Sequence, residues 1–192
     1  DMVRTAWAAA SSHRTTDHRG GVNGARIALD PQDTWVVNDP EELKVALKKL
    51  ESVRDHFNAS QHAGRKISLA DLIVLAGNVG LEVAARQAGV SIHVPFEAGR
   101  VDATQAQTDV NSFSALEPTA DAFRNYYRSV PDGKSPTEAL VDRASTLDLT
   151  IPEMTVLLGG MRSLDVNTAH SPEGILTDHP GTLSNDFLIN VL

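Results

Sequence analysis

The sequence contains no cysteine, and this absence removes several kinds of chemistry at once. None of its 192 residues can form a disulfide, hold an iron–sulfur cluster, bind haem iron through a thiolate or act as a thiol nucleophile. The redox compartment stays open, because a chain without cysteine is compatible with a reducing or an oxidising one.

Aromatic residues and long apolar runs are also scarce. Aromatics make up 5% of the chain within a hydrophobic content of 41%, and the frequent Ala and Leu suit packed helices better than sheets. The longest apolar run, residues 72–83, is broken by Asn78 and Glu82 and is too short to cross a bilayer. We therefore expect an all-α fold without a membrane span.

Positive charge is in short supply, since 17 Lys and Arg face 25 Asp and Glu, a net charge of −8. A phosphate backbone is bound chiefly by clustered Lys and Arg, so a nucleic-acid partner is disfavoured. The seven histidines show neither the i, i+4 spacing of a helical zinc site nor that of a zinc finger. We expect no metal site. Phosphate-loop, dinucleotide and serine-hydrolase motifs are also missing.

The periodicity of apolar residues and the helix-start signals predict the helical segments. A helix is expected over residues 2–10, followed by a long ordered loop over 15–37. Asp39 and Pro40 then predict the cap and first residue of a second helix. We expect a buried stripe along this helix, made of Leu43, Leu47, Leu50, Val53 and Phe57.

The remaining signals divide the rest of the chain. Ser68 to Asp71 predicts the start of a central helix that runs to about Gln87 and ends at Gly89. A short extended piece at 92–94 and a small hairpin within the loop 168–182 are also expected. A further helix is expected over 116–128, and another over 137–147 after a turn at Pro131–Gly133. The next helix is expected to start at 150 and to be interrupted by Gly159 and Gly160, and a last one to start at 184.

Five stretches of sequence carry a family resemblance. In chain order they are TAWAAA (5–10), RGGVNGAR (19–26), SLADLIVLAGN (68–78), PFEAGRVDA (95–103) and PEMTVLLGGMR (152–162). With SNDFL (184–188), the chain resembles the intracellular class of haem peroxidases, and specifically the duplicated C-terminal domain of catalase-peroxidases. The resemblance implies a single haem-peroxidase-like helical domain over 1–192, truncated at both ends and part of a larger two-domain enzyme.

The resemblance also identifies the positions that face peroxide in active members. There the distal helix supplies an Arg, a Trp and a His base, and here Arg4 and Trp7 are followed by Ala8. A methyl group cannot take up the peroxide proton. Asn78 matches the Asn that orients the missing base. We interpret these four residues as a vestigial distal pocket, with Trp7 as core packing, Asn78 as a satisfied helix amide and Arg4 as a partner for Asp or Glu.

The proximal side departs from the active pattern as well. Active members continue Gly-Gly with a His that binds the iron, whereas Gly159 and Gly160 precede Met161 and Arg162. Met can ligate haem iron, but the resemblance implies that the Arg162 side chain fills the volume of the lost haem. We interpret this pair as a vestigial proximal position. Arg100 and Asp102 are expected to form structural ion pairs that tie their loop to the helices.

These residues are compatible with three hypotheses about function. The favoured hypothesis is a non-catalytic domain without a cofactor, which supports hydrogen peroxide decomposition by an N-terminal domain of the same polypeptide that carries haem b. The parent is expected to be a cytoplasmic homodimer, with export as the alternative. The second hypothesis is an independent haem peroxidase with Met161 as axial ligand and Arg4 as its distal catalyst. The third is an acidic helical module for dimerisation.

Overall fold

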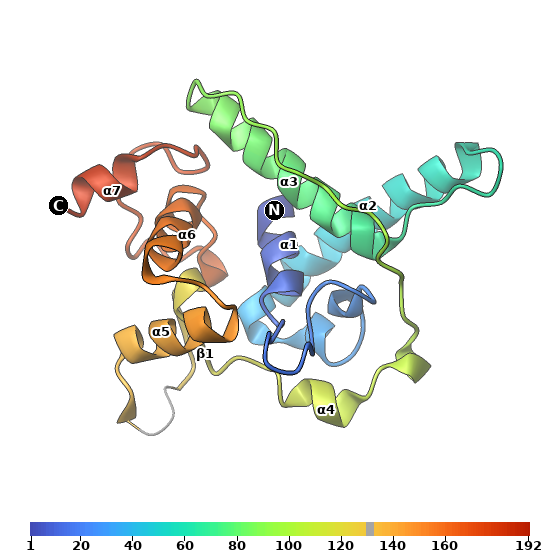
Figure 1. Ribbon diagram of the computed structural model, residues 1–192, viewed down its shortest axis with the longest axis horizontal. Helices are drawn as coiled ribbons and strands as arrows, with labels where there is room; N and C mark the ends of the chain where they lie inside the picture. Colours follow the sequence, from blue (N-terminus) through green and yellow to red (C-terminus); the bar gives the residue numbers. More distant parts are fainter. Residues whose placement is uncertain (130–132) are drawn as a thin grey trace. The chain divides into compact units, whose positions relative to one another are not determined.

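The computed structural model describes residues 1–129 and 133–192, which divide into two compact units (Figure 1). The first unit comprises residues 1–13, 19–80 and 94–117, and the second comprises 14–18, 81–93 and 118–192. Helices dominate both units, which confirms the expected all-α class. Within the described residues, no helix combines the length and the apolar character needed to cross a membrane.

The first unit is built from the helices that the sequence predicts most clearly. Its helices are α1 (Met2–Ala10), α2 (Pro40–Ser60), α3 (Leu69–Gln87) as far as Gly80, and the short α4 (Val110–Ser114). The expected loop over 15–37 contains 3₁₀ turns at Arg26–Ala28 and Gln32–Thr34, with a third at Val36–Asn38. Another 3₁₀ turn lies at Gln105–Gln107. The predicted bounds of α1 and α3 are thereby confirmed.

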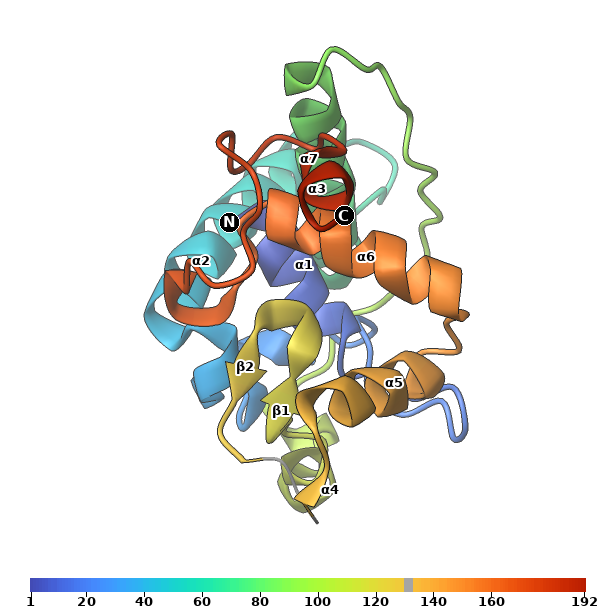
Figure 2. The same cartoon turned by 90° about the vertical axis from the view of Figure 1, so that its left-hand side faces the viewer.

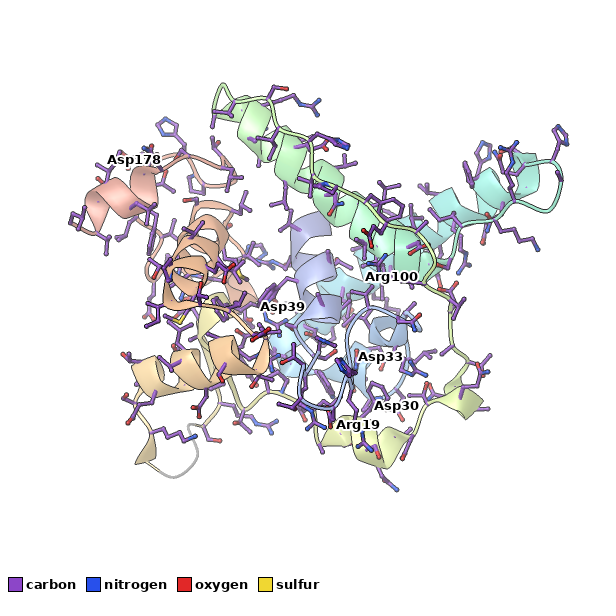
Figure 3. The ribbon with its side chains drawn as sticks, viewed as in Figure 1. Arg19, Asp30, Asp33, Asp39, Arg100 and Asp178 are labelled. Carbon is purple, nitrogen blue, oxygen red and sulfur yellow. The ribbon has the colours of Figure 1, made fainter. Side chains whose placement is uncertain are left out.

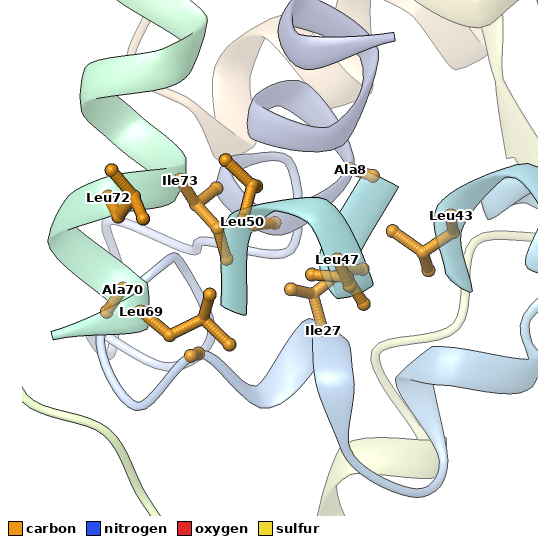
Figure 4. Close-up of a cluster of buried hydrophobic side chains, with 11 residues drawn as sticks. Ala8, Ile27, Leu43, Leu47, Leu50, Leu69, Ala70, Leu72 and Ile73 are labelled. Atoms are coloured by element: carbon orange, nitrogen blue, oxygen red, sulfur yellow. The ribbon is translucent and has the colours of Figure 1, made fainter. Parts of the chain in front are cut away.

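A cluster of apolar side chains holds the first unit together (Figure 4). Its larger members are Leu43, Leu47 and Leu50 from α2, with Leu69 and Ile73 from α3, and Ile27 from the loop joins them. The helices α1 and α3 approach closely, because a Cβ at Gly77 would lie 2.5 Å from the Cβ of Ala6. The cluster therefore joins the N-terminal helix to both long helices.

The stripe predicted along α2 is only half correct. Leu43, Leu47 and Leu50 are buried, but Val53 is 55% exposed and Phe57 is 43% exposed. The helix continues for several turns past the apolar cluster (Figure 1). The contacts of these turns are polar, since Asn58 exchanges two hydrogen bonds with the backbone of Ile67.

The second unit contains the end of α3, a small hairpin and three helices (Figure 2). Strands β1 (Ala120–Asp121) and β2 (Tyr126–Tyr127) pair antiparallel, with Asp121 opposite Tyr126. Helix α5 (Pro136–Thr146) contacts β1 and the 3₁₀ turn Ala122–Arg124, and α6 (Ile151–Ser163) contacts this turn and α7 (Asp186–Asn190). The expected helices at 137–147, from 150 and from 184 are confirmed.

The helix expected over 116–128 is wrong, because the chain reverses there. The carboxylate of Asp121 accepts hydrogen bonds from the backbone N of Phe123 at 3.0 Å and from Nε of Arg124 at 2.9 Å. Asn125 then adopts a positive φ of 54°, which ends the 3₁₀ turn. A short polar side chain bonded to its own backbone thus favours the hairpin over a helix.

Three smaller expectations also fail. Helix α6 runs through Gly159 and Gly160 without a break, residues 92–94 form no strand, and the loop 168–182 contains a 3₁₀ turn instead of a hairpin. Both glycines are helical, and the missing side chain of Gly159 leaves room for α7, because a Cβ there would lie 2.8 Å from the ring of Phe187. Of the turn expected at 131–133, Pro131 and Asp132 lie outside the described residues.

Candidate functional site

Arg4 links α1 to the start of α2. Its Nη1 lies 2.9 Å from Oε2 of Glu42 and 3.4 Å from Oδ2 of Asp39, and only 11% of its side chain is exposed. Asp39 stands at the predicted N-cap position but makes no side-chain cap hydrogen bond, which corrects the expected capping (Figure 3). The acidic partner expected for Arg4 is confirmed, and two carboxylates share it.

Ala8 is part of the apolar cluster of the first unit (Figure 4). It is 3% exposed and shares the cluster with leucines of α2, while Trp7, the next residue towards the N-terminus, is partly buried. The position that would carry the base is therefore surrounded by apolar side chains. A methyl group at this position cannot accept the peroxide proton.

Asn78 is a satisfied amide on α3. Its Nδ2 donates to the carbonyl oxygen of Pro95 at 3.0 Å, so the side chain holds the extended segment that follows α3. This confirms the interpretation of Asn78 as a helix amide bonded to a neighbour. Arg4 and Asn78 thus bond to different segments, Arg4 to the start of α2 and Asn78 to the segment that follows α3.

Two carboxylates fasten the segment after α3, in which Arg100 is labelled in Figure 3, to the first turn of that helix. Asp71 accepts from the backbone N of Gly99 at 2.8 Å and of Arg100 at 3.2 Å, and from Nη1 of Arg100 at 3.0 Å. In return, Asp102 accepts from the backbone N of Leu69 and Ala70 at 2.8 and 2.9 Å. The expected ties at Arg100 and Asp102 are confirmed, with Asp102 acting mainly as a cap for α3.

The electrostatics of this fastening follow from its hydrogen bonds. Burial opposes ionisation of Asp71, but the hydrogen bonds from Gly99 and from Arg100 favour the charged form and outweigh it. The pKa of Asp71 is therefore held below its ordinary value. Ser68 caps the same turn, since its Oγ accepts from the backbone N of Asp71 at 3.0 Å.

Met161 and Arg162 lie on the buried side of α6, with 4% and 7% exposure. The guanidinium of Arg162 donates to the carbonyl oxygens of Ala122 at 2.8 Å and Phe123 at 3.3 Å, and to the side-chain oxygen of Asn167. Burial lowers the pKa of Arg162, and nearby Asp121 opposes this shift. The side chain thus fastens α6 to the turn between β1 and β2.

The sequence interpretation missed a buried ion pair between Asp121 and Arg124, in the turn that Arg162 contacts. Asp121 is 0% exposed, Arg124 is 2% exposed, and Oδ2 and Nε lie 2.9 Å apart. The signal that could have revealed them is the Asp-x-x-Arg spacing in DAFR, in which the Asp can also bond the backbone two residues on. The pair sets the turn whose carbonyl oxygens receive Arg162.

The matched positions do not fit haem chemistry. A haem peroxidase needs a distal base and an axial ligand, and the chain offers a buried methyl group at position 8 and a thioether at position 161. The cation beside each position is already engaged, Arg4 by carboxylates and Arg162 by carbonyl oxygens. Among the residues that the structure describes, no three His, Asp or Glu side chains are grouped to hold a metal ion.

Comparisons with known proteins agree with the sequence resemblance. The chain is 65% identical over its whole length to the catalase-peroxidase of Granulibacter bethesdensis, of which it covers 25%. It is 60% identical to catalase-peroxidase 2 of Burkholderia vietnamiensis, of which it covers 26%, and 64% identical over 191 residues to the catalase-peroxidase of Leptospira biflexa. The chain thus spans about a quarter of the length of these relatives. The family model described as peroxidase matches residues 1–188, and the chain belongs to the peroxidase family.

Proposed function

We propose that this chain is a non-catalytic, haem-less domain of a catalase-peroxidase, which supports hydrogen peroxide decomposition by a haem-bearing N-terminal domain of the same polypeptide. The observation that carries the proposal is the pair of substituted positions, Ala8 and Met161, which are both buried. The parent's haem b and its assembly as a homodimer belong to the same proposal.

On the distal side, the function that this chain lacks in our proposal is the transfer of the peroxide proton. Heterolytic cleavage of the O–O bond needs a base that takes this proton and returns it to the leaving oxygen, and it benefits from a cation near the developing charge. Position 8 is a methyl group inside an apolar cluster, and Arg4 is held by Glu42 and Asp39. The residues that replace the distal machinery therefore stabilise the first unit.

On the proximal side, the function that this chain lacks in our proposal is axial ligation of the haem iron. Met161 is buried in α6, and the adjacent Arg162 is bonded to the carbonyl oxygens of Ala122 and Phe123. These bonds compensate the cost of burying a guanidinium. Arg162 stands directly after Met161 and is held by these carbonyl oxygens, which argues against the alternative of an independent peroxidase that uses Met161.

Complementation tests the supporting role. The haem-bearing N-terminal part of a catalase-peroxidase is prepared alone, and its catalase activity is measured as the 192-residue chain is added. We expect a saturable rise in activity that levels off near equimolar chain. An unrelated acidic helical protein at the same concentration serves as the control. A flat titration at every ratio would contradict the proposal.

A further inference from the structure

The apolar face of α2 continues beyond the part of the chain that covers it. Leu50 is 5% exposed, yet Val53 and Phe57, three and seven residues later on the same face, are 55% and 43% exposed. Neither side chain belongs to the apolar cluster or to the side chains packed on it. A stripe at this spacing is the pattern of a covered helix face.

Val45 shows that this exposure is not simply a property of valine in α2. It is also 55% exposed, but it follows Leu43 by two residues and therefore lies on the opposite face of the helix. A single exposed valine on a solvent face is ordinary. Val53 and Phe57 differ because they extend a face that is buried one turn earlier.

The charge around this face is opposite in sign to that of the rest of the chain. Residues 49–67, which surround the two side chains, contain four Lys and Arg and two Asp and Glu, a net charge of +2. The rest of the chain carries −10, which gives the total of −8. Arg65 and Lys66, in the turn after α2, are exposed. An acidic contact would complement this region.

We propose that Val53 and Phe57 form a docking face, the α2 end face, which receives an acidic segment with an apolar centre from the part of the parent polypeptide outside residues 1–192. Relatives are about four times as long as this chain, so most of such a polypeptide lies outside it. Apolar side chains at the centre and charges at the rim are the usual arrangement of a specific interface. The inference deepens the proposed supporting role and rests on it for the existence of the partner.

Site-specific photocross-linking in the full-length polypeptide tests this face. The photoreactive amino acid p-benzoylphenylalanine replaces Phe57 in one preparation and Val45 in the matched control, and cross-linked peptides are identified by mass spectrometry. From position 57 we expect cross-links to acidic peptides outside residues 1–192, at a yield independent of protein concentration. Adding Val53→Glu should lower this yield about tenfold, whereas Val45→Glu should leave it unchanged.

Two results would overturn the inference. Cross-links between copies of residues 1–192, rising with concentration, would assign the α2 end face to self-association. A yield from position 57 no higher than that from position 45 would mean that nothing covers it. Binding of haem by the chain would contradict the proposed function but would not change these yields, so the two failures are distinguishable.

Discussion

The guanidinium of Arg4 lies 2.9 Å from the carboxylate of Glu42, so the arginine that matches the distal cation of an active peroxidase is a link between α1 and α2. Its second carboxylate, Asp39, precedes the first residue of α2 and is only 16% exposed. Arg4 therefore neutralises the two carboxylates at the start of α2.

Replacing Arg4 should cost stability. Arg4→Met removes the cation from a poorly exposed carboxylate, and we expect a loss of about 1–2 kcal/mol in the free energy of unfolding, reduced from the fully buried case by solvent screening. Glu42→Gln is the control: its carboxylate is 48% exposed, so its loss should cost less than about 1 kcal/mol. Urea unfolding measures both, and an unchanged midpoint for Arg4→Met would contradict the structural role.

Restoring a histidine at position 8 should not restore peroxidase chemistry. Ala8→His inserts an imidazole into an apolar cluster, and we expect it to lower the free energy of unfolding by about 1–3 kcal/mol through overpacking. Lys49→His, on the exposed side of α2, should change it by less than about 0.5 kcal/mol. Thermal unfolding and a peroxidase assay check the pair. A stable Ala8→His variant that oxidises substrate would show that the pocket is still functional.

The two adjacent glycines of α6 should respond in opposite ways. A Cβ at Gly159 would meet the Phe187 ring at 2.8 Å, whereas at Gly160 its nearest neighbour is Leu183 at 3.6 Å, an ordinary contact. Gly159→Ala should therefore destabilise the chain by about 1–3 kcal/mol, while Gly160→Ala should be neutral or stabilise it by up to about 1 kcal/mol. Chemical denaturation decides, and equal effects of the two changes would refute the close packing of α6 and α7.

Acid should weaken the fastening between α3 and the segment that follows it. The folded-state pKa of Asp71 lies below its ordinary value, so its contribution to stability is complete above the unfolded-state pKa and is lost as the pH falls through the folded-state pKa. The window thus begins near pH 4 and extends downwards. Unfolding measured from pH 7 to pH 3 should show this loss in the wild type. In Asp71→Asn the decline should be shallower, and an identical slope would exclude Asp71 as its source.

Local signals placed the starts of α3 and α6 correctly because each capping partner lies within three residues of the other. Thr150 and Glu153 exchange both capping hydrogen bonds, and Ser68 caps α3 as its sequence predicts. The family resemblance likewise identified Ala8 and Met161 as the residues at the positions of the two histidines of active members. These features depend on chain order alone.

Contacts between distant segments were beyond the sequence. Asp102 caps a helix that begins 33 residues earlier. Gly159 packs against Phe187, which is 28 residues later and leaves no room for a side chain at position 159. The exposure of Val53 and Phe57 depends on what covers α2, which its own periodicity does not reveal. The sequence predicted an acidic partner for Arg4 but not which carboxylates hold it, and it did not predict the carbonyl oxygens that hold Arg162.

Haem titration followed by visible spectroscopy tests the central claim most directly. Haem is added stepwise to the purified chain, with free haem in buffer as the reference and Met161→Ala as the matched variant. We expect no saturable Soret band beyond that of free haem, for the wild type and the variant alike. A Soret band that saturates at one haem per chain and disappears in Met161→Ala would contradict it.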